Sequence, residues 1–95
     1  MPHPKKIILH CLNGYSPQLD AMVEEFIRDG VIFVGVVGKD CARVEAILDE
    51  IVVGDGSRDY HLLTSSHPDE SLEEVIQFAE SLTGEFKGTA HVLEV

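Results

Sequence analysis

Basic residues are scarce in this sequence. Its 95 residues include 7 lysines and arginines against 17 aspartates and glutamates, which gives a formal net charge of −10. A protein that binds nucleic acid or anionic lipid neutralises phosphate groups with lysine and arginine. The composition therefore argues against nucleic-acid and membrane partners. It is compatible with a basic protein partner, with a cation, or with nothing more than a well-solvated surface.

Long apolar runs and a disulfide framework are also missing. The longest apolar run, Val31–Val37, is far too short to span a membrane. Residues 1–6 lead into only about six apolar-leaning positions, so we expect no signal peptide and a cytoplasmic protein. Two cysteines, Cys11 and Cys41, are too few for a disulfide scaffold, and we expect both to remain reduced.

The common motifs of catalysis and cofactor binding do not occur. The sequence has no glycine-rich dinucleotide fingerprint, no P-loop and no Gly-x-Ser-x-Gly elbow. It has five histidines, but none pairs with another ligand at the short spacing typical of zinc sites. We therefore predict no metal site. The sequence names no cofactor and no catalytic residue, and it leaves open whether the protein is an enzyme.

Four segments have the composition of β-strands. Lys5–Leu12 is rich in isoleucine and leucine. Val31–Val37 is apolar on both faces, as in a strand that helices cover on both sides. Tyr60–Thr64 predicts a shorter third strand. Thr89–Val95 predicts a fourth, whose alternating pattern sends even-numbered and odd-numbered residues to opposite faces.

Three amphipathic helices separate these strands. Ser16 is the predicted N-cap of the first helix, and Gly30 is its expected C-terminal stop. Asp40 is the predicted cap of the second helix. The third begins with the capping-box pattern of Ser71 and Glu74, in which each side chain can bond the backbone N–H of the other residue.

The order strand–helix–strand–helix–strand–helix–strand predicts one α/β domain over residues 1–95. We expect a three-layer α/β/α sandwich with a four-stranded, mostly parallel sheet and right-handed crossovers. The half-Rossmann strand order 3-2-1-4 is favoured, and 2-1-3-4 is the alternative. The last loop is short enough to allow an antiparallel fourth strand, which we expect to form an edge of the sheet.

Polar residues gather at three predicted strand-to-helix junctions, residues 10–14, 38–41 and 64–70. In a parallel α/β sheet such junctions meet at the carboxyl edge, where ligands usually bind. The candidate ligand-binding residues at these junctions are Asp40, Cys41, His67, Asp69 and Glu70.

Both cysteines also have a packing interpretation. Cys41 begins a helix, where the macrodipole stabilises a thiolate, but it precedes Val44 and Leu48 on the apolar stripe. Cys11 alternates with Leu9 along the first strand. We therefore expect both thiols to be buried. A ligand site requires that His67 face Asp40 or Cys41 across an open pocket.

Two segments carry a family resemblance. Residues 38–45, with acidic positions up to 55, and residues 64–74, with Phe78 after them, resemble a family of small bacterial proteins known only as a domain of unknown function. The resemblance covers about residues 31–79. Members of that family often have a tryptophan before the His-x-Asp-Glu element, where this chain has Ser66. The resemblance supplies no activity, and it implies only that the five candidate residues lie in characteristic segments.

Two hypotheses of function follow, and the sequence itself leaves the function unknown. The favoured one is a non-catalytic interaction module that binds a protein partner, or a second copy of itself, through the exposed edge strand. The alternative is a ligand-binding or metal-binding site, with enzymatic activity included, at the carboxyl edge of the sheet. The five candidate residues would form it.

Overall fold

A computed structural model describes residues 4–54 and 62–95 of the chain. The strands are β1 (Lys6–Cys11), β2 (Phe33–Gly38), β3 (Leu63–His67) and β4 (His91–Glu94). The helices are α1 (Gln18–Asp29), α2 (Cys41–Val53) and α3 (Leu72–Glu80), and a short 3-10 turn (Gly84–Phe86) precedes β4.

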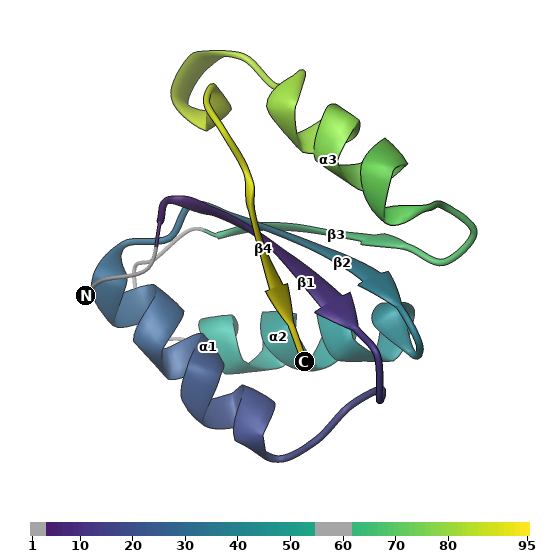
Figure 1. Ribbon diagram of the computed structural model, residues 1–95. Coiled ribbons are helices and arrows are strands. Elements are labelled where there is room, and N and C mark those ends of the chain that lie inside the picture. The colour runs from purple at the N-terminus through teal and green to yellow at the C-terminus, as the bar shows by residue number, and fades with distance from the viewer. Residues whose placement is uncertain (1–3, 55–61) are drawn as a thin grey trace.

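The four strands form one parallel sheet in the order β3-β2-β1-β4. The predicted order 3-2-1-4 is confirmed, and the last strand runs parallel to the others. Helices α1 and α2 cover one face of the sheet and α3 covers the other, which gives the three layers (Figure 1). None of the helices in residues 4–54 and 62–95 is both long and apolar enough to span a bilayer.

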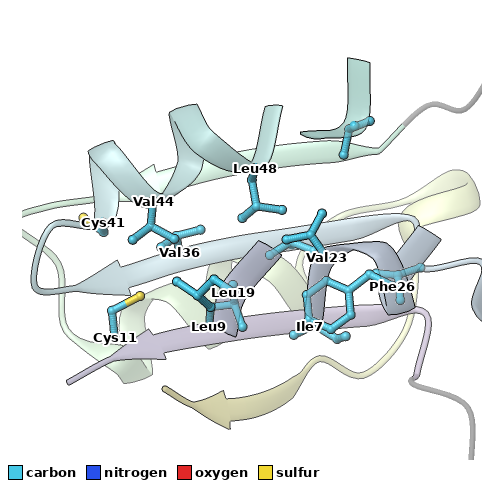
Figure 2. Packing of buried hydrophobic residues seen from close by; sticks show 13 residues of the cluster. Ile7, Leu9, Cys11, Leu19, Val23, Phe26, Val36, Cys41, Val44 and Leu48 are labelled. Atoms are coloured by element: carbon cyan, nitrogen blue, oxygen red, sulfur yellow. The ribbon is translucent and has the colours of Figure 1, made fainter. Parts of the chain in front are cut away.

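The face under α1 and α2 holds the larger core (Figure 2). The predicted helix stripes meet β1 and β2 there, because residues three and four apart share one side of a helix. Its thirteen buried residues are Ile7, Leu9, Cys11, Leu19, Val23, Phe26, Val31, Val34, Val36, Cys41, Val44, Leu48 and Val52. This core fixes both the sheet and the ends of β1 and β2 from which the first two junctions start.

The face under α3 holds a smaller core and one buried cation. Its buried apolar residues are Ile8, Phe33, Val37, Val75, Ala79 and Ala90. Lys6 lies on the same face with 2% of its surface exposed. Its Nζ donates to the carbonyl of Ala79, at the end of α3, and to that of Gly88 at 2.9 Å. Burial lowers the pKa of Lys6, and the nearby Glu80 carboxylate partly opposes that shift.

The predicted boundaries of the third strand are wrong. The strand begins at Leu63 and runs to His67, and Tyr60 and His61 lie outside the described residues. Strand β2 offers pairing partners from Phe33 to Val37, so the polar residues of the third junction continue the ladder. The Thr64 hydroxyl also finds acceptors on α2, Glu45 Oε2 at 3.0 Å and Asp49 Oδ1 at 2.8 Å.

The three predicted helix caps have different outcomes. The Ser71–Glu74 capping box is confirmed, with Glu74 N donating to Ser71 Oγ and Ser71 N to Glu74 Oε1. Asp40 occupies the N-cap of α2 but makes no capping bond with its side chain, because its backbone is left-handed (φ 56°). The cap prediction for Ser16 is wrong, since Pro17 is the N-cap residue and Ser16 supplies a backbone carbonyl.

Candidate functional site

The structure divides the five candidate residues between the two faces of the sheet. Cys41 is 3% exposed and belongs to the core under α1 and α2. His67 is 6% exposed and pairs with Val37, whose side chain belongs to the core under α3. Asp40, Asp69 and Glu70 are exposed. His67 therefore does not face Cys41, and one site composed of all five residues is not formed.

Around Asp40, two glycines lie so close to neighbouring atoms that a side chain would not fit. A Cβ on Gly14 would lie 2.7 Å from Asp40 Oδ2, and one on Gly38 would lie 2.4 Å from the carbonyl oxygen of Cys11. Both glycines also have positive φ values, 76° and 104°. Lys39 N donates to the Cys11 carbonyl at 2.9 Å, which joins the second junction to the end of β1. The first two junctions therefore lie against each other, through the Asp40 side chain at Gly14 and through backbone atoms at Cys11.

The two cysteines lie at the same end of the larger core (Figure 2). Both are buried and free. Burial raises the pKa of Cys11 to about 11, and the neighbouring Cys41 and Asp40 add to the increase. A thiol with that pKa is almost entirely protonated at neutral pH and is a weak nucleophile. The packing interpretation of the cysteines is therefore favoured over a redox pair.

A hydrogen-bonded relay joins three residues of the third junction. Ser65 Oγ lies 2.8 Å from His67 Nε2, and His67 Nδ1 lies 2.9 Å from Glu70 Oε1. His67 and Glu70 are among the residues predicted from the sequence, whereas Ser65 is not. The predicted strand ends at Thr64, so it does not include Ser65 and His67. In a strand, residues two apart lie on the same face, and this places Ser65 beside His67. The relay gives both ring nitrogens of a buried histidine a partner.

One aromatic ring, that of Phe78, lies against His67. The centroid of the Phe78 ring lies 5.1 Å from that of His67, at an angle of 58° between their planes. Phe78 also lies 6.4 Å from Phe33, centroid to centroid. Helix α3 therefore covers the imidazole through Phe78. The Ser71–Glu74 capping box fixes the start of that helix. The ring is held in one orientation by two hydrogen bonds and one aromatic contact.

A second histidine lies in the same row of the sheet. His10 pairs with Val37 on one side and with Glu94 on the other, so Val37 separates His10 from His67. Its Nδ1 is buried without a hydrogen bond and lies 3.8 Å from Glu94 Oε2. Within the described residues, no three histidine, cysteine or acidic side chains gather closely enough to hold a metal ion.

A cavity of about 340 Å³ opens at the carboxyl edge of the sheet, on the side of α1. It lies between the first junction, the start of α1 and the end of β4. Its walls are Asn13, Gly14, Ser16, Gln18, Leu19, Met22, Glu94 and Val95. None of the five candidate residues contributes to it, and its one ionisable side chain is acidic, which disfavours a phosphate ligand at the helix N-terminus.

Comparison with known proteins assigns the chain to a family. The model of a family described as a domain of unknown function (DUF7684) matches residues 1–93, so the chain belongs to this family. The match extends well beyond the segments that carry the resemblance in the sequence. No curated protein and no solved structure matches the chain. The family brings no established activity, and function has to be argued from the geometry.

Proposed function

We propose that this protein is an interaction module that binds an extended segment of a basic partner protein along the outer edge of β4. The main support is the direction in which the backbone N–H and C=O groups of β4 point. Val95 N donates to the carbonyl of His10 at 3.0 Å, and the carbonyl of Val95 accepts from Leu12 N at 2.8 Å. Alternate residues of a parallel strand direct these groups to opposite sides. The N–H and C=O groups of Val92 and Glu94 therefore point away from β1.

β4 is a short edge strand of four residues, and some of the usual protections of an edge are absent from it. The strand contains no proline, lysine or glycine, all of which discourage pairing with another chain. Val92 is 36% exposed, and Leu12 beside the end of the strand is 52% exposed. Just before the strand, Ala90 N donates to the Glu80 carboxylate at 3.2 Å. The edge available for pairing therefore begins at Val92.

Charge favours a basic partner over a second copy. The chain carries a net charge of −10, and Glu94 exposes 66% of its side chain at this edge. Two copies paired edge to edge would bring like charges together, whereas lysine or arginine on an added strand would be attracted. The free cysteines support a reducing environment, and we infer a cytoplasmic location for this interaction.

The test is an NMR titration with a defined probe. A synthetic extended peptide of alternating valine and lysine is added to the ¹⁵N-labelled protein, and amide shifts are followed. We expect the largest shifts at Val92 and Glu94, with smaller ones at Leu12. The same peptide with alternate amides N-methylated cannot complete the ladder and should give no shifts at these residues.

Two variants separate edge pairing from charge attraction. Val92→Pro removes an outward N–H without touching a bond to β1, and it should abolish the shifts. Val92→Thr keeps the N–H and should retain them. Shifts spread over acidic helices, or unchanged in Val92→Pro, would contradict the proposal. Self-association in sedimentation velocity, lost in Val92→Pro, would replace the basic partner by a second copy.

A further inference from the structure

We propose that Ser65, His67 and Glu70 form a catalytic triad that hydrolyses carboxylic esters with small apolar acyl groups. The three side chains meet the two geometric conditions of a serine nucleophile. The nucleophile bonds its base at 2.8 Å, and a third group bonds the opposite nitrogen of that base at 2.9 Å. The proposal is independent of partner binding at β4, which lies at the opposite edge of the sheet.

The Glu70 carboxylate sets the tautomer of the imidazole. An ionised carboxylate can only accept, so His67 Nδ1 carries the proton of their bond. Nε2 of the neutral ring is then an acceptor, and the Ser65 hydroxyl donates to it. This is the arrangement in which Nε2 can remove the hydroxyl proton. Burial of the ring and the contact with Phe78 keep that nitrogen directed at Ser65.

The surroundings of Ser65 define the substrate class. Ser65 is partly exposed on β3, an edge strand, so a substrate can approach it from solvent. Leu63, two residues earlier on the same face, is 42% exposed, and Phe78 on α3 is 41% exposed. These two partly exposed apolar side chains, Leu63 on the strand of Ser65 and Phe78 against the ring of His67, provide a surface for an apolar acyl chain. Glu70 and Asp69 make the rim acidic, which disfavours anionic substrates.

The reaction proceeds in two steps, acylation of Ser65 and hydrolysis of the acyl-Ser65 ester. Ser65 Oγ attacks the ester carbonyl carbon while its proton passes to His67 Nε2. The bond to the leaving oxygen then breaks, and that oxygen takes the proton from Nε2 to leave as an alcohol. Water attacks the resulting acyl-Ser65 ester and gives its proton to Nε2. Release of the carboxylic acid returns that proton to Ser65 Oγ, so no other reactant is consumed.

The experiment measures both turnover and the covalent intermediate. The full chain is incubated with p-nitrophenyl butyrate, release of p-nitrophenolate is recorded, and acid-quenched samples are analysed by peptide mass spectrometry. We expect an initial burst and one butyryl group on Ser65. Ser65→Ala should lower the rate by about 100-fold or more and abolish the adduct. Ser66→Ala, on the opposite face of the same strand, should retain both.

Glu70→Gln tests the positioning role of the carboxylate. It should lower kcat, leave KM unchanged and leave the melting temperature close to that of the parent, because Glu70 is exposed. Val92→Pro should retain full hydrolysis, so failure of edge binding and failure of the triad are distinguishable. Absence of a butyryl group on Ser65, or a rate unchanged in Ser65→Ala, would overturn the proposal and leave the relay a packing device for a buried imidazole.

Discussion

The two faces of the sheet are closed by different means. Under α1 and α2, thirteen buried side chains form a core whose only heteroatoms are the sulfurs of Cys11 and Cys41. Under α3, the apolar cluster is smaller, and Lys6, His67 and Ser65 are held on the same face by hydrogen bonds. The proposed triad lies on the α3 face, and the proposed binding edge of β4 lies at the border of the sheet with solvent.

This difference shows where the chain has freedom to carry chemistry. A dry, close-packed core tolerates few polar groups, because each unpaired one costs free energy. The α3 face accepts polar groups because each finds partners: Lys6 in two carbonyls, and His67 in Ser65 and Glu70. It contributes less apolar burial to stability and contains the buried lysine and the hydrogen-bonded histidine.

The largest effect should come from the core under α1 and α2. Leu48→Ala removes a side chain that is 1% exposed and should lower the free energy of unfolding by about 2–5 kcal/mol. Ile76→Ala, at a partly buried position of α3, should cost less. Urea denaturation of both variants measures the difference. A cost of Ile76→Ala equal to that of Leu48→Ala would show that the two faces contribute alike.

A smaller effect should come from the buried lysine under α3. Lys6→Met keeps the length of the side chain but removes the donor to the carbonyls of Ala79 and Gly88. We expect a loss of about 1–3 kcal/mol in the free energy of unfolding. Lys5→Met, at the exposed neighbouring position, is the matched control and should change stability little.

The cost of Lys6→Met should also depend on pH. Burial lowers the pKa of Lys6 in the folded state, so the unfolded chain binds more protons between the folded and the unfolded pKa. The part of this stabilisation that depends on pH is fully present above the unfolded pKa and is lost as pH falls through the folded one, whereas the hydrogen bonds to Ala79 and Gly88 contribute over the whole range. Denaturation at pH 10.5 should therefore give a larger difference between parent and variant than at pH 8. The reverse order would contradict a lowered pKa of Lys6 in the folded state.

The smallest effect concerns the start of α3. Ser71→Ala removes one bond of the capping box and should cost about 1 kcal/mol in the free energy of unfolding. Ser81→Ala, which loses a bond to the Phe78 carbonyl at the exposed end of the helix, should cost less. Since α3 covers His67, Ser71→Ala should also speed hydrogen exchange at α3 before it affects α1. Uniform exchange over all three helices would indicate that the two faces open together.

The sequence predicts the fold well because periodicity and connection length constrain it strongly. Val31–Val37, apolar on both faces, identifies a central strand, and the helix stripes of three-and-four spacing identify the covering helices. The predicted third strand ends too early, at Thr64, because Ser65 and Ser66 resemble a loop in isolation. The place of Thr64, Ser65 and Ser66 in the ladder depends on β2 and on the acids of α2, which local sequence does not reveal.

The candidate site was predictable only in part. His67 and Glu70 meet because they are three residues apart in a turn, which is local information. The separation of Cys41 from His67 depends on which face each helix covers, and that is set by crossover handedness and packing of the whole chain. Recognition of Ser65 as a partner requires the true end of β3 at His67. Asp40 required its left-handed backbone, which turns the side chain toward Gly14.

The central position of β1 has a consequence for the order in which the molecule assembles. Strand β1 pairs with β2 at residues 33–38 but also with β4 at residues 91–94. The side chain of Lys6, in the same strand, donates hydrogen bonds to carbonyls 73 and 82 positions further along the chain. Contacts of such long sequence separation slow folding. During synthesis one edge of β1 would remain unpaired until β4 has emerged. Over that interval a chaperone would have the largest unpaired edge to cover.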